Sequence, residues 1–229
     1  MMDLLDNKKI NILCFGDSNT WGCVGRWQES LLPPPRYDAE HRWPDVMAKE
    51  LGEGYNVVTD ALCGRTTIYT HRDEGPMYSA EPYMLACMRC HSPLDLMIIM
   101  LGTNDIYNYP DLTADNIGDG ISKLIDMAQA SQWGRDFKAP KILVMAPIEL
   151  KRSAPNGRVL VYEKYRGAEG EALSKLFAST YKRIAEEKGC GYLNAAEFAT
   201  PGDADGLHMD ENSQIALGKA VAAWVKENM

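Results

Sequence analysis

The sequence lacks the features of an exported or membrane-spanning chain. Its longest apolar run, residues 94–101, is interrupted by Asp95 and falls far short of the ~20 residues that a bilayer-spanning helix needs. Residues 1–10 are polar and of mixed charge, so no signal peptide is visible. We therefore expect a cytoplasmic protein with no membrane partner.

Positive charge is scarce as well. The chain has 24 Lys and Arg residues against 32 Asp and Glu residues, for a formal net charge of -8. A field of this sign repels phosphate, which argues against a nucleic-acid partner and weakens any proposal of binding to anionic lipid. The six cysteines lie mostly in apolar segments, where we expect them to behave as small buried hydrophobes.

Apolar runs alternate with amphipathic helical stretches, which is typical of a mostly parallel sheet covered by helices. With 45% apolar residues among 229, the chain can bury a sizeable core, and we expect one domain over residues 1–229. The expected strands are residues 10–15, 55–60, 95–101, 141–146 and 191–193. The expected helices are residues 43–51, 114–130 and 168–187, followed by a last helix from about Glu211 that Asp210 is placed to cap.

Two long segments, residues 23–42 and 148–165, fit neither strands nor helices. Long loops in a compact domain are usually functional or interfacial, and ligands of open parallel sheets bind at the carboxyl ends of the strands. Large apolar residues in the first loop would otherwise face water. We expect this loop either to contact another subunit of a homo-oligomer or to cover the pocket as a lid, through Trp27, Leu31 and Leu32.

A serine follows the first expected strand directly, in the segment Phe15-Gly16-Asp17-Ser18-Asn19-Thr20-Trp21-Gly22. This position places Ser18 at the mouth of the sheet, either as a nucleophile or as an ordinary helix N-cap. The segment is not a Gly-x-Ser-x-Gly elbow, because position 20 is threonine. Trp21 lies about one helical turn from Ser18, so it either walls an acyl pocket or packs against the fold.

The segment Asp205-Gly206-Leu207-His208 near the C-terminus offers an acid–base pair. A hydroxyl becomes a good nucleophile only when a base takes its proton, and the base needs a partner that fixes its tautomer. Gly206 permits the tight turn that would bring Asp205 and His208 side by side. The alternatives are a solvated surface loop, or Asp203 as the carboxylate partner.

Hydrogen-bond donors follow two further strands, in Gly102-Thr103-Asn104-Asp105 and Cys63-Gly64-Arg65. The Asn104 amide and the backbone N–H of Gly64 could stabilise a developing oxyanion. Gly, Asn and Asp also favour ordinary turns, which is the simpler interpretation of the Asn104 segment by itself. Because all four segments follow strands at one edge of a parallel sheet, together they predict a serine hydrolase.

These segments resemble the blocks of the SGNH superfamily, also called GDSL-type hydrolases. The matching positions are Ser18, Gly64, Asn104 and His208, with Asp205 as the third triad member, and the resemblance extends from residue 10 to the last helix. It implies a flavodoxin-like, three-layer α/β/α SGNH hydrolase fold with a five-stranded, mostly parallel sheet. The implied mechanism needs no metal and no organic cofactor. Asn19 stands where the family signature has leucine, which puts only the local packing in doubt.

Within the superfamily, residues 17–22, 64–67 and 96–105 are similar to the bacterial arylesterase and acyltransferase branch. That branch handles small acyl esters, some members pass the acyl group to alcohols or peroxide, and many are oligomers. We therefore expect a serine esterase that hydrolyses, and can transfer, short acyl groups through an acyl-serine intermediate. The alternatives are a carbohydrate O-acetylesterase and a non-catalytic ester- or sugar-binding pseudo-enzyme; the filled catalytic positions argue against the second.

One motif points elsewhere. Cys87-Met88-Arg89-Cys90-His91 matches the Cys-x-x-Cys-His pattern of haem attachment. The segment is apolar and helix-like, and the chain shows no export signal, so we expect core cysteines here. We expect no zinc site either, because no second ligand pair lies at a suitable spacing.

Overall fold

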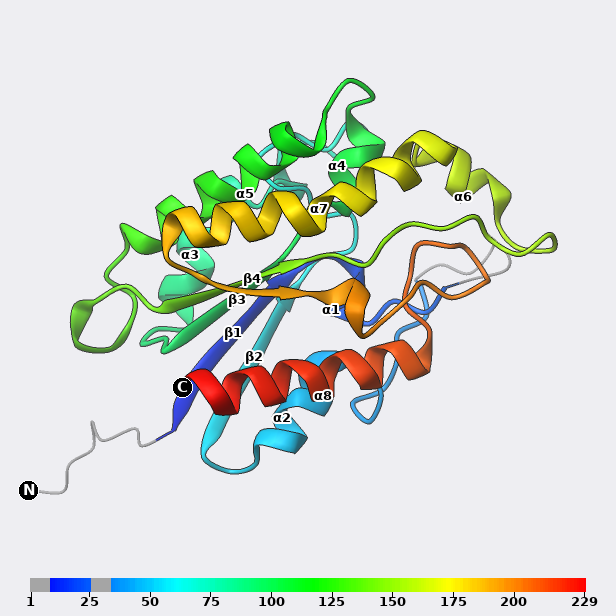
Figure 1. Ribbon diagram of the computed structural model, residues 1–229. Coiled ribbons are helices and arrows are strands. Elements are labelled where there is room, and N and C mark those ends of the chain that lie inside the picture. Colours follow the sequence, from blue (N-terminus) through cyan, green and yellow to red (C-terminus); the bar gives the residue numbers. More distant parts are fainter. Residues whose placement is uncertain (1–8, 26–33) are drawn as a thin grey trace, which may run out of the picture.

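The computed structural model describes residues 9–25 and 34–229. Within these residues, five parallel strands form one sheet in the order β2-β1-β3-β4-β5 (Figure 1). Their bounds are β1 (Ile10–Gly16), β2 (Tyr55–Ala61), β3 (Leu96–Met100), β4 (Lys141–Ala146) and β5 (Gly191–Asn194). This is the flavodoxin-like strand order, so the predicted fold class is confirmed.

Helices cover both faces of the sheet. Figure 1 shows α3, α5 and α7 over one face and α2 and α8 over the other, which gives the three predicted layers. The long helices are α2 (Trp43–Leu51), α3 (Glu81–Cys90), α5 (Ala114–Gln129), α7 (Gly167–Lys188) and α8 (Glu211–Asn228). Three short ones lie near the carboxyl ends of the strands: α1 (Ser18–Trp21), α4 (Thr103–Asn108) and α6 (Val159–Lys164). Asp210 caps α8 as expected, since its carboxylate accepts from the Ser213 N–H at 2.7 Å.

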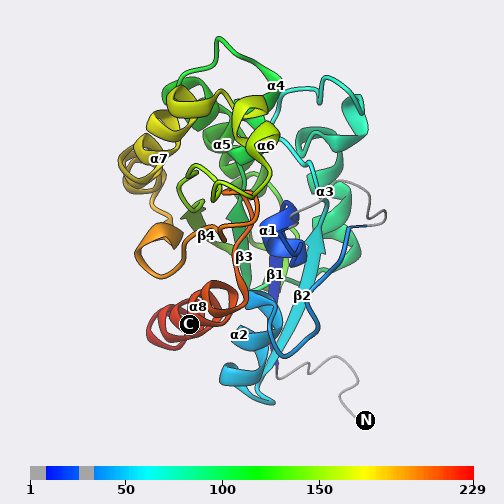
Figure 2. The ribbon, with the colours of Figure 1, turned by 90° about the vertical axis from the view of Figure 1, so that its right-hand side faces the viewer.

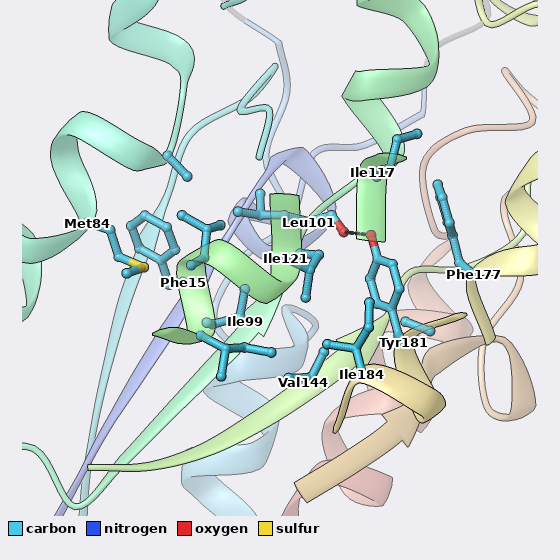
Figure 3. Close-up of a cluster of buried hydrophobic side chains, with 14 of the residues drawn as sticks. Phe15, Met84, Ile99, Leu101, Ile117, Ile121, Val144, Phe177, Tyr181 and Ile184 are labelled. Atoms are coloured by element: carbon cyan, nitrogen blue, oxygen red, sulfur yellow. Dashed lines mark hydrogen bonds between the residues drawn. The ribbon is translucent and has the colours of Figure 1, made fainter. Parts of the chain in front are cut away.

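Strand alternation divides the apolar interior into two clusters. Successive strand residues point to opposite faces, so Leu13 and Phe15 of β1 pack with α3, α5 and α7, while Ile12 and Cys14 pack with α2 and α8. Figure 3 shows the first cluster, to which α7 contributes Phe177, Tyr181 and Ile184. In the same cluster the Tyr181 hydroxyl donates to the Leu101 carbonyl at 2.9 Å. The two clusters fix the strands, and thereby the edge from which the loops emerge.

The second predicted loop is partly helical. Its turn is present, because the Gly157 N–H donates to the Ala154 carbonyl at 2.7 Å, but α6 follows at once. The prediction of an irregular segment over residues 148–165 is therefore wrong for α6. The short apolar run that begins at Val159 forms one helical turn and buries Val161 against the first cluster.

The first predicted loop is pinned at both ends. The Val24 N–H donates to the Pro35 carbonyl at 2.9 Å, and the Tyr37 N–H donates to the Gly22 carbonyl at 2.8 Å. Trp27, Leu31 and Leu32, on which the predicted subunit contact depends, lie outside the described residues. The homo-oligomer and the lid therefore both stay predictions.

Figure 2 looks onto the carboxyl ends of the strands, with α1 near the middle and the loops gathered around it. The candidate catalytic residues were predicted from the sequence to lie at this edge of the sheet. Among the helices of the described residues, none combines the length and the apolar character needed to cross a membrane.

Candidate active site

Ser18 is the first residue of α1, directly beyond the end of β1. The N-cap of this helix is Asp17, whose carboxylate accepts from the Asn19 N–H at 3.0 Å. Ser18 is therefore not the N-cap, and its hydroxyl is free to face the edge of the sheet. The turn presents a buried serine at the carboxyl end of a central strand, as the sequence predicted.

His208 joins Ser18 to Asp205. Its Nε2 lies 3.0 Å from Ser18 Oγ, and its Nδ1 lies 2.7 Å from Asp205 Oδ2. Gly206 makes the turn between them with φ of +68°, and a Cβ there would lie 1.9 Å from the carbonyl oxygen of Lys151. Asp203, the rival carboxylate, instead pairs with Lys151 at 2.8 Å.

Electrostatics favour a histidine that accepts a proton from Ser18. Burial by itself would lower the pKa of His208, but the hydrogen bond and negative charge of Asp205 raise it above its ordinary value. Burial opposes ionisation of Asp205 too, yet its hydrogen bonds and the His208 charge lower its pKa to about 2. Asp205 thus stays negative at neutral pH and stabilises an imidazolium at His208.

Asn104 and Gly64 lie on the same cavity as Ser18. The Asn104 side-chain N–H₂ donates to the Arg65 carbonyl at 3.0 Å and reaches Asp17 Oδ2 at 3.5 Å. The second contact is long, so that N–H is held only weakly by Asp17. The oxyanion role predicted for Asn104 and Gly64 requires this shared cavity.

The loop that carries Gly64 is held at several points. Gly64 has φ of +87°, a conformation that residues with a Cβ rarely adopt. The Arg65 guanidinium donates to the Gly16 carbonyl at 3.1 Å and to Asp60 Oδ1 at 2.8 Å. Further along, the Thr67 hydroxyl donates to Asp105 Oδ1 at 2.6 Å. These bonds connect the loop to β1, β2 and the residues just beyond β3.

Two residues that hydrogen-bond to the candidate site were not recognised from the sequence. The first is Asn19, whose Oδ1 accepts from the Met209 N–H at 2.9 Å and whose Nδ2 donates to the Leu207 carbonyl at 3.2 Å. These two bonds bracket His208 and fasten its loop to the helix of Ser18. The departure from leucine at position 19 was visible in the sequence, but it was assigned to packing alone.

The second missed residue is Tyr165, at the end of α6. Its hydroxyl donates to Asn104 Oδ1 at 2.8 Å and so fixes which way the amide points. Burial raises the pKa of Tyr165, so the hydroxyl keeps its proton and remains a donor. The only sequence signal was its place in a long segment expected to be functional.

Trp21 lies beside the site, with its ring under the Arg36 guanidinium at 4.8 Å. Its carbonyl also accepts from Arg36 Nε at 2.7 Å. It does not belong to the cavity lining formed by the residues that the structure describes. This placement favours the packing alternative for Trp21, and an acyl-pocket role stays a prediction.

The cavity beside Ser18 has a volume of about 330 Å³. Its wall contains the groups described above together with charged, aromatic and apolar residues. The lining includes Cys23, Pro34, Cys63, His71, Glu74, Tyr78, Tyr107, Arg158, Val161, Lys164, Tyr165 and Leu207. Such a space suits a small substrate with polar groups.

Metal-ligand atoms come together elsewhere. Among the described residues, Asp60, Cys87 and His91 offer ligand atoms within 4.8 Å of one another. Asp60 is already bonded to Arg65 and to the Tyr83 hydroxyl, with which a cation would compete. Burial also raises the pKa of Cys87, and none of the three ligands lines the cavity of Ser18.

Comparison with known proteins identifies the family. Residues 14–213 match the GDSL-like lipase/acylhydrolase family. The chain belongs to this family. No curated protein matches it at a significant level. Its assignment as a carboxylic ester hydrolase of the SGNH superfamily agrees with the predicted resemblance.

Solved structures of esterases share the fold over nearly the whole chain. The aryl esterase of M. smegmatis is 33% identical with a TM-score of 0.85, and the match covers 96% of this chain and 100% of that one. Est24, a carbohydrate acetylesterase from Sinorhizobium meliloti, is 33% identical with a TM-score of 0.87 and the same coverage. A carbohydrate acetylesterase family member from Sinorhizobium meliloti is 28% identical with a TM-score of 0.82, covering 95% and 98%.

Proposed function

We propose that this SGNH-family protein is a serine esterase that removes short acyl groups from small esters through an acyl-serine intermediate. The observation that carries the proposal is the hydrogen-bonded line from Ser18 through His208 to the buried Asp205, open to a cavity at the sheet edge. A buried line of this kind activates a hydroxyl that is otherwise a poor nucleophile.

In the proposed reaction, Ser18 Oγ attacks the ester carbonyl while His208 Nε2 takes the hydroxyl proton. The imidazolium then gives this proton to the leaving alcohol, and the acyl group stays on Ser18. Water, or a second alcohol, attacks the acyl-serine with His208 again as base. Asp205 holds the imidazole by Nδ1 throughout and stabilises its charged form.

Negative charge on the carbonyl oxygen is met by three expected donors: the Asn104 amide and the backbone N–H groups of Ser18 and Gly64. As charge develops, the Asn104 N–H that makes the long contact to Asp17 donates to the oxyanion as well. Tyr165 keeps the amide oriented, because its hydroxyl holds Oδ1 on the other side. We therefore expect the Asn104 amide to move little during the reaction.

The size and wall of the cavity support a short acyl group. A space of about 330 Å³ lies at the small end of ligand pockets. Its wall is as polar as it is apolar, and Glu74, Arg158 and Lys164 are among its charged residues. A long lipid chain would leave those charged groups desolvated without partners.

The same wall favours a second candidate, removal of acetyl groups from carbohydrate. Glu74, Arg158 and Lys164 line the cavity, where they could bind the hydroxyl groups of a sugar. The similarity to Est24, described as a carbohydrate acetylesterase, supports this candidate as well. Both candidates use the same chemistry at Ser18 and differ in the alcohol that leaves.

Replacement of the nucleophile tests the proposal. Ser18→Ala removes the oxygen that carries the acyl group in the proposed reaction, and loss of a serine nucleophile in such a site lowers kcat by roughly 10⁶-fold. We expect no measurable turnover of a chromogenic acetate ester, with the melting temperature close to that of the wild type. Near-normal turnover by a folded Ser18→Ala protein would exclude the acyl-serine mechanism.

A substrate series separates the two candidates. The values of kcat/KM are compared for an acetate ester of a simple alcohol, its longer-chain analogue and an acetylated sugar, each with and without an added acceptor alcohol. A higher value for the acetylated sugar assigns the carbohydrate role. Preference for the long-chain ester would contradict the short-acyl proposal for both.

A further inference from the structure

A second histidine lies on the wall of the catalytic cavity. His71 lines the same cavity as Ser18 and is only 8% exposed. It takes no part in the hydrogen bonds that join Ser18, His208 and Asp205. Because buried polar groups are normally hydrogen-bonded, the partners of its two ring nitrogens decide what this side chain does.

The backbone of its own turn occupies one nitrogen of the His71 ring. The backbone N–H groups of Asp73 and Glu74 donate to Nδ1 at 3.3 and 3.2 Å. A ring nitrogen that accepts carries no hydrogen, so the hydrogen of the neutral imidazole is on Nε2. Burial lowers the pKa of His71 below its ordinary value, against the negative charges of Asp73 and Glu74, so the ring is neutral at neutral pH.

The Nε2 edge of the ring lies beside Gly64. A Cβ at residue 64 would lie 3.5 Å from Nε2, so the glycine leaves this nitrogen uncovered where both residues line the cavity. Among the residues that the structure describes, none accepts a hydrogen bond from Nε2. The Nε2–H of His71 is therefore a buried donor at the cavity, and an oxygen of a bound molecule satisfies it.

The surroundings hold this donor in place. The rings of Tyr78 and Tyr107 lie against His71, with centroid distances of 5.3 and 5.9 Å. The Tyr107 hydroxyl also donates to the Asp73 carboxylate in the same turn. Tyr107 belongs to α4, the helix that carries Asn104. The turn of His71 is thus attached to the helix of an expected oxyanion donor, and a donor fixed in this way needs no ordering when a substrate binds.

We propose that His71 is a specificity-determining residue whose Nε2–H donates to an oxygen in the alcohol part of the ester. This inference rests on the proposed esterase function. A short acyl group such as acetyl has no oxygen beyond the ester itself, so the acceptor belongs to the leaving alcohol. Since Nε2 lies beside Gly64, whose N–H is an expected oxyanion donor, the acceptor lies close to the ester group. The substrate class is a monoester of a diol, a polyol or a sugar, with a free hydroxyl next to the esterified one.

Burial distinguishes His71 from the charged residues of the cavity. Glu74 and Lys164 line the same space, but both are exposed and reach it on flexible side chains. An ester with a methyl group in place of the neighbouring hydroxyl would cover the His71 N–H without accepting from it. A buried donor left without a partner is costly, so the site should discriminate against that ester.

The experiment compares two acetate esters of equal size. These are 2-hydroxyethyl acetate and propyl acetate, which differ by a hydroxyl in place of a methyl group. The ratio of their kcat/KM values is measured for the wild type, His71→Asn and His71→Gln. Asparagine keeps an acceptor near the place of Nδ1 for the N–H groups of the turn but has no donor at the place of Nε2. Glutamine extends its amide N–H₂ to about the place of Nε2.

We expect the wild-type ratio to favour the hydroxyethyl ester. It should fall roughly tenfold in His71→Asn, the effect of one hydrogen bond, and should rise again in His71→Gln. The value of kcat/KM for propyl acetate should not fall in either variant, because the hydrogen bonds of Ser18 are unchanged. His91→Asn is the matched control, because His91 lies at the end of α3, outside the lining that the described residues give the cavity, and should keep the wild-type ratio.

The ratio is decisive because the intrinsic reactivities of the two esters are the same for every variant. An unchanged ratio in His71→Asn, equal losses for both esters, or no higher ratio in His71→Gln than in His71→Asn would overturn the proposal. Turnover of propyl acetate by the wild type tests the esterase function separately, since that ester has no hydroxyl for His71 to bind.

Discussion

Strand β1 and the turn that follows it are equally buried but are held in different ways. Ile12 through Phe15 are at most 1% exposed, and Asp17 through Thr20 are at most 7% exposed. The strand residues contact apolar neighbours in two clusters, whereas Asp17 and Asn19 are held by hydrogen bonds. An apolar contact tolerates a substitute of similar shape, but a buried polar group needs its particular partner.

The difference separates stability from positioning. The apolar strand interior contributes to the free energy of unfolding through buried area, and its exact side chains do not touch a substrate. The hydrogen bonds of the polar turn instead fix the positions of groups that face the cavity. Substitutions in the strand interior should therefore lower the free energy of unfolding, whereas substitutions in the polar turn should lower kcat. The predictions below test this separation.

Asp205→Asn should produce the largest effect among the polar groups other than Ser18. An amide cannot hold His208 in the tautomer that accepts the Ser18 proton, so kcat should fall roughly 10⁴-fold. Stability should change little, because asparagine has the same shape. Stopped assays of acetate-ester turnover measure the first quantity, and thermal unfolding measures the second.

The pH profile tests the same role of Asp205 through the direction in which the acid limb moves. Since Asp205 raises the pKa of His208 and the neutral imidazole is the active form, the acid limb of kcat/KM should have its midpoint above pH 6.5 in the wild type. Burial without the carboxylate lowers that pKa, so the residual activity of Asp205→Asn should have its acid limb at lower pH. A limb that does not move would mean that another group controls the rate.

Phe177→Ala tests the apolar side of the comparison. Phe177 is fully buried in the cluster of Figure 3, and deleting such a ring costs about 3–5 kcal/mol of unfolding free energy. Because the ring lies away from the cavity, kcat and KM per folded molecule should stay near their wild-type values. Chemical denaturation gives the free energy, and active-site titration gives the folded fraction. A selective loss of kcat would show that core packing also positions the site.

Asn104→Ala should show the opposite pattern. Loss of one oxyanion donor typically lowers kcat by about 10²–10³-fold, while KM changes less because the contact tightens only as charge develops. Tyr165→Phe is a useful companion, since it removes the bond to Asn104 Oδ1 but leaves the donor, and its effect on kcat should be smaller. An effect of Asn104→Ala on KM alone would assign it to substrate binding.

The same comparison explains what the sequence could predict. The strands were predicted within a residue or two, because apolar runs and amphipathic periods are local patterns. The meeting of the candidate catalytic segments at one edge followed from the expectation of a parallel sheet. Helix α6 was missed because a single turn of helix leaves too short a period to recognise. Its neighbour Tyr165 was missed because its partner, Asn104, is 61 residues away in sequence.

Asn19 shows the limit most clearly, because its Met209 partner lies 190 residues along the chain. A local pattern identifies the residue as polar beside a nucleophile, but not what it binds. Cys23 and Cys63 are similar: each was expected to be a buried hydrophobe from its own surroundings, and only the fold places both on the wall of the cavity. Partners distant in sequence are the part of a site that one sequence does not reveal.

The smallest effect we predict comes from Asn19→Leu, and it tests positioning directly. Leucine removes both bonds that bracket His208 and leaves the Leu207 carbonyl and the Met209 N–H buried without these partners. Each unsatisfied group costs about 1–3 kcal/mol, so the His208 loop should shift or loosen. We expect kcat to fall about tenfold, which corresponds to ~1.4 kcal/mol, with KM nearly unchanged. Asn11→Leu is the matched control, since Asn11 is a buried asparagine near the amino end of β1, the strand that precedes α1.

Asn11 also makes two side-chain bonds, donating to the Pro93 carbonyl at 2.9 Å and accepting from Asn56 at 3.1 Å. Its loss should lower the unfolding free energy to a similar extent as the loss of Asn19. Because it lies far from the cavity, kcat should not change. Equal effects of the two variants on kcat would refute a positioning role for Asn19. Its hydrogen bonds would then contribute to stability alone. A decrease in kcat confined to Asn19→Leu would establish that buried Asn19, beyond the carboxyl end of β1, positions His208. Buried Asn11, near the amino end, would then contribute to stability alone.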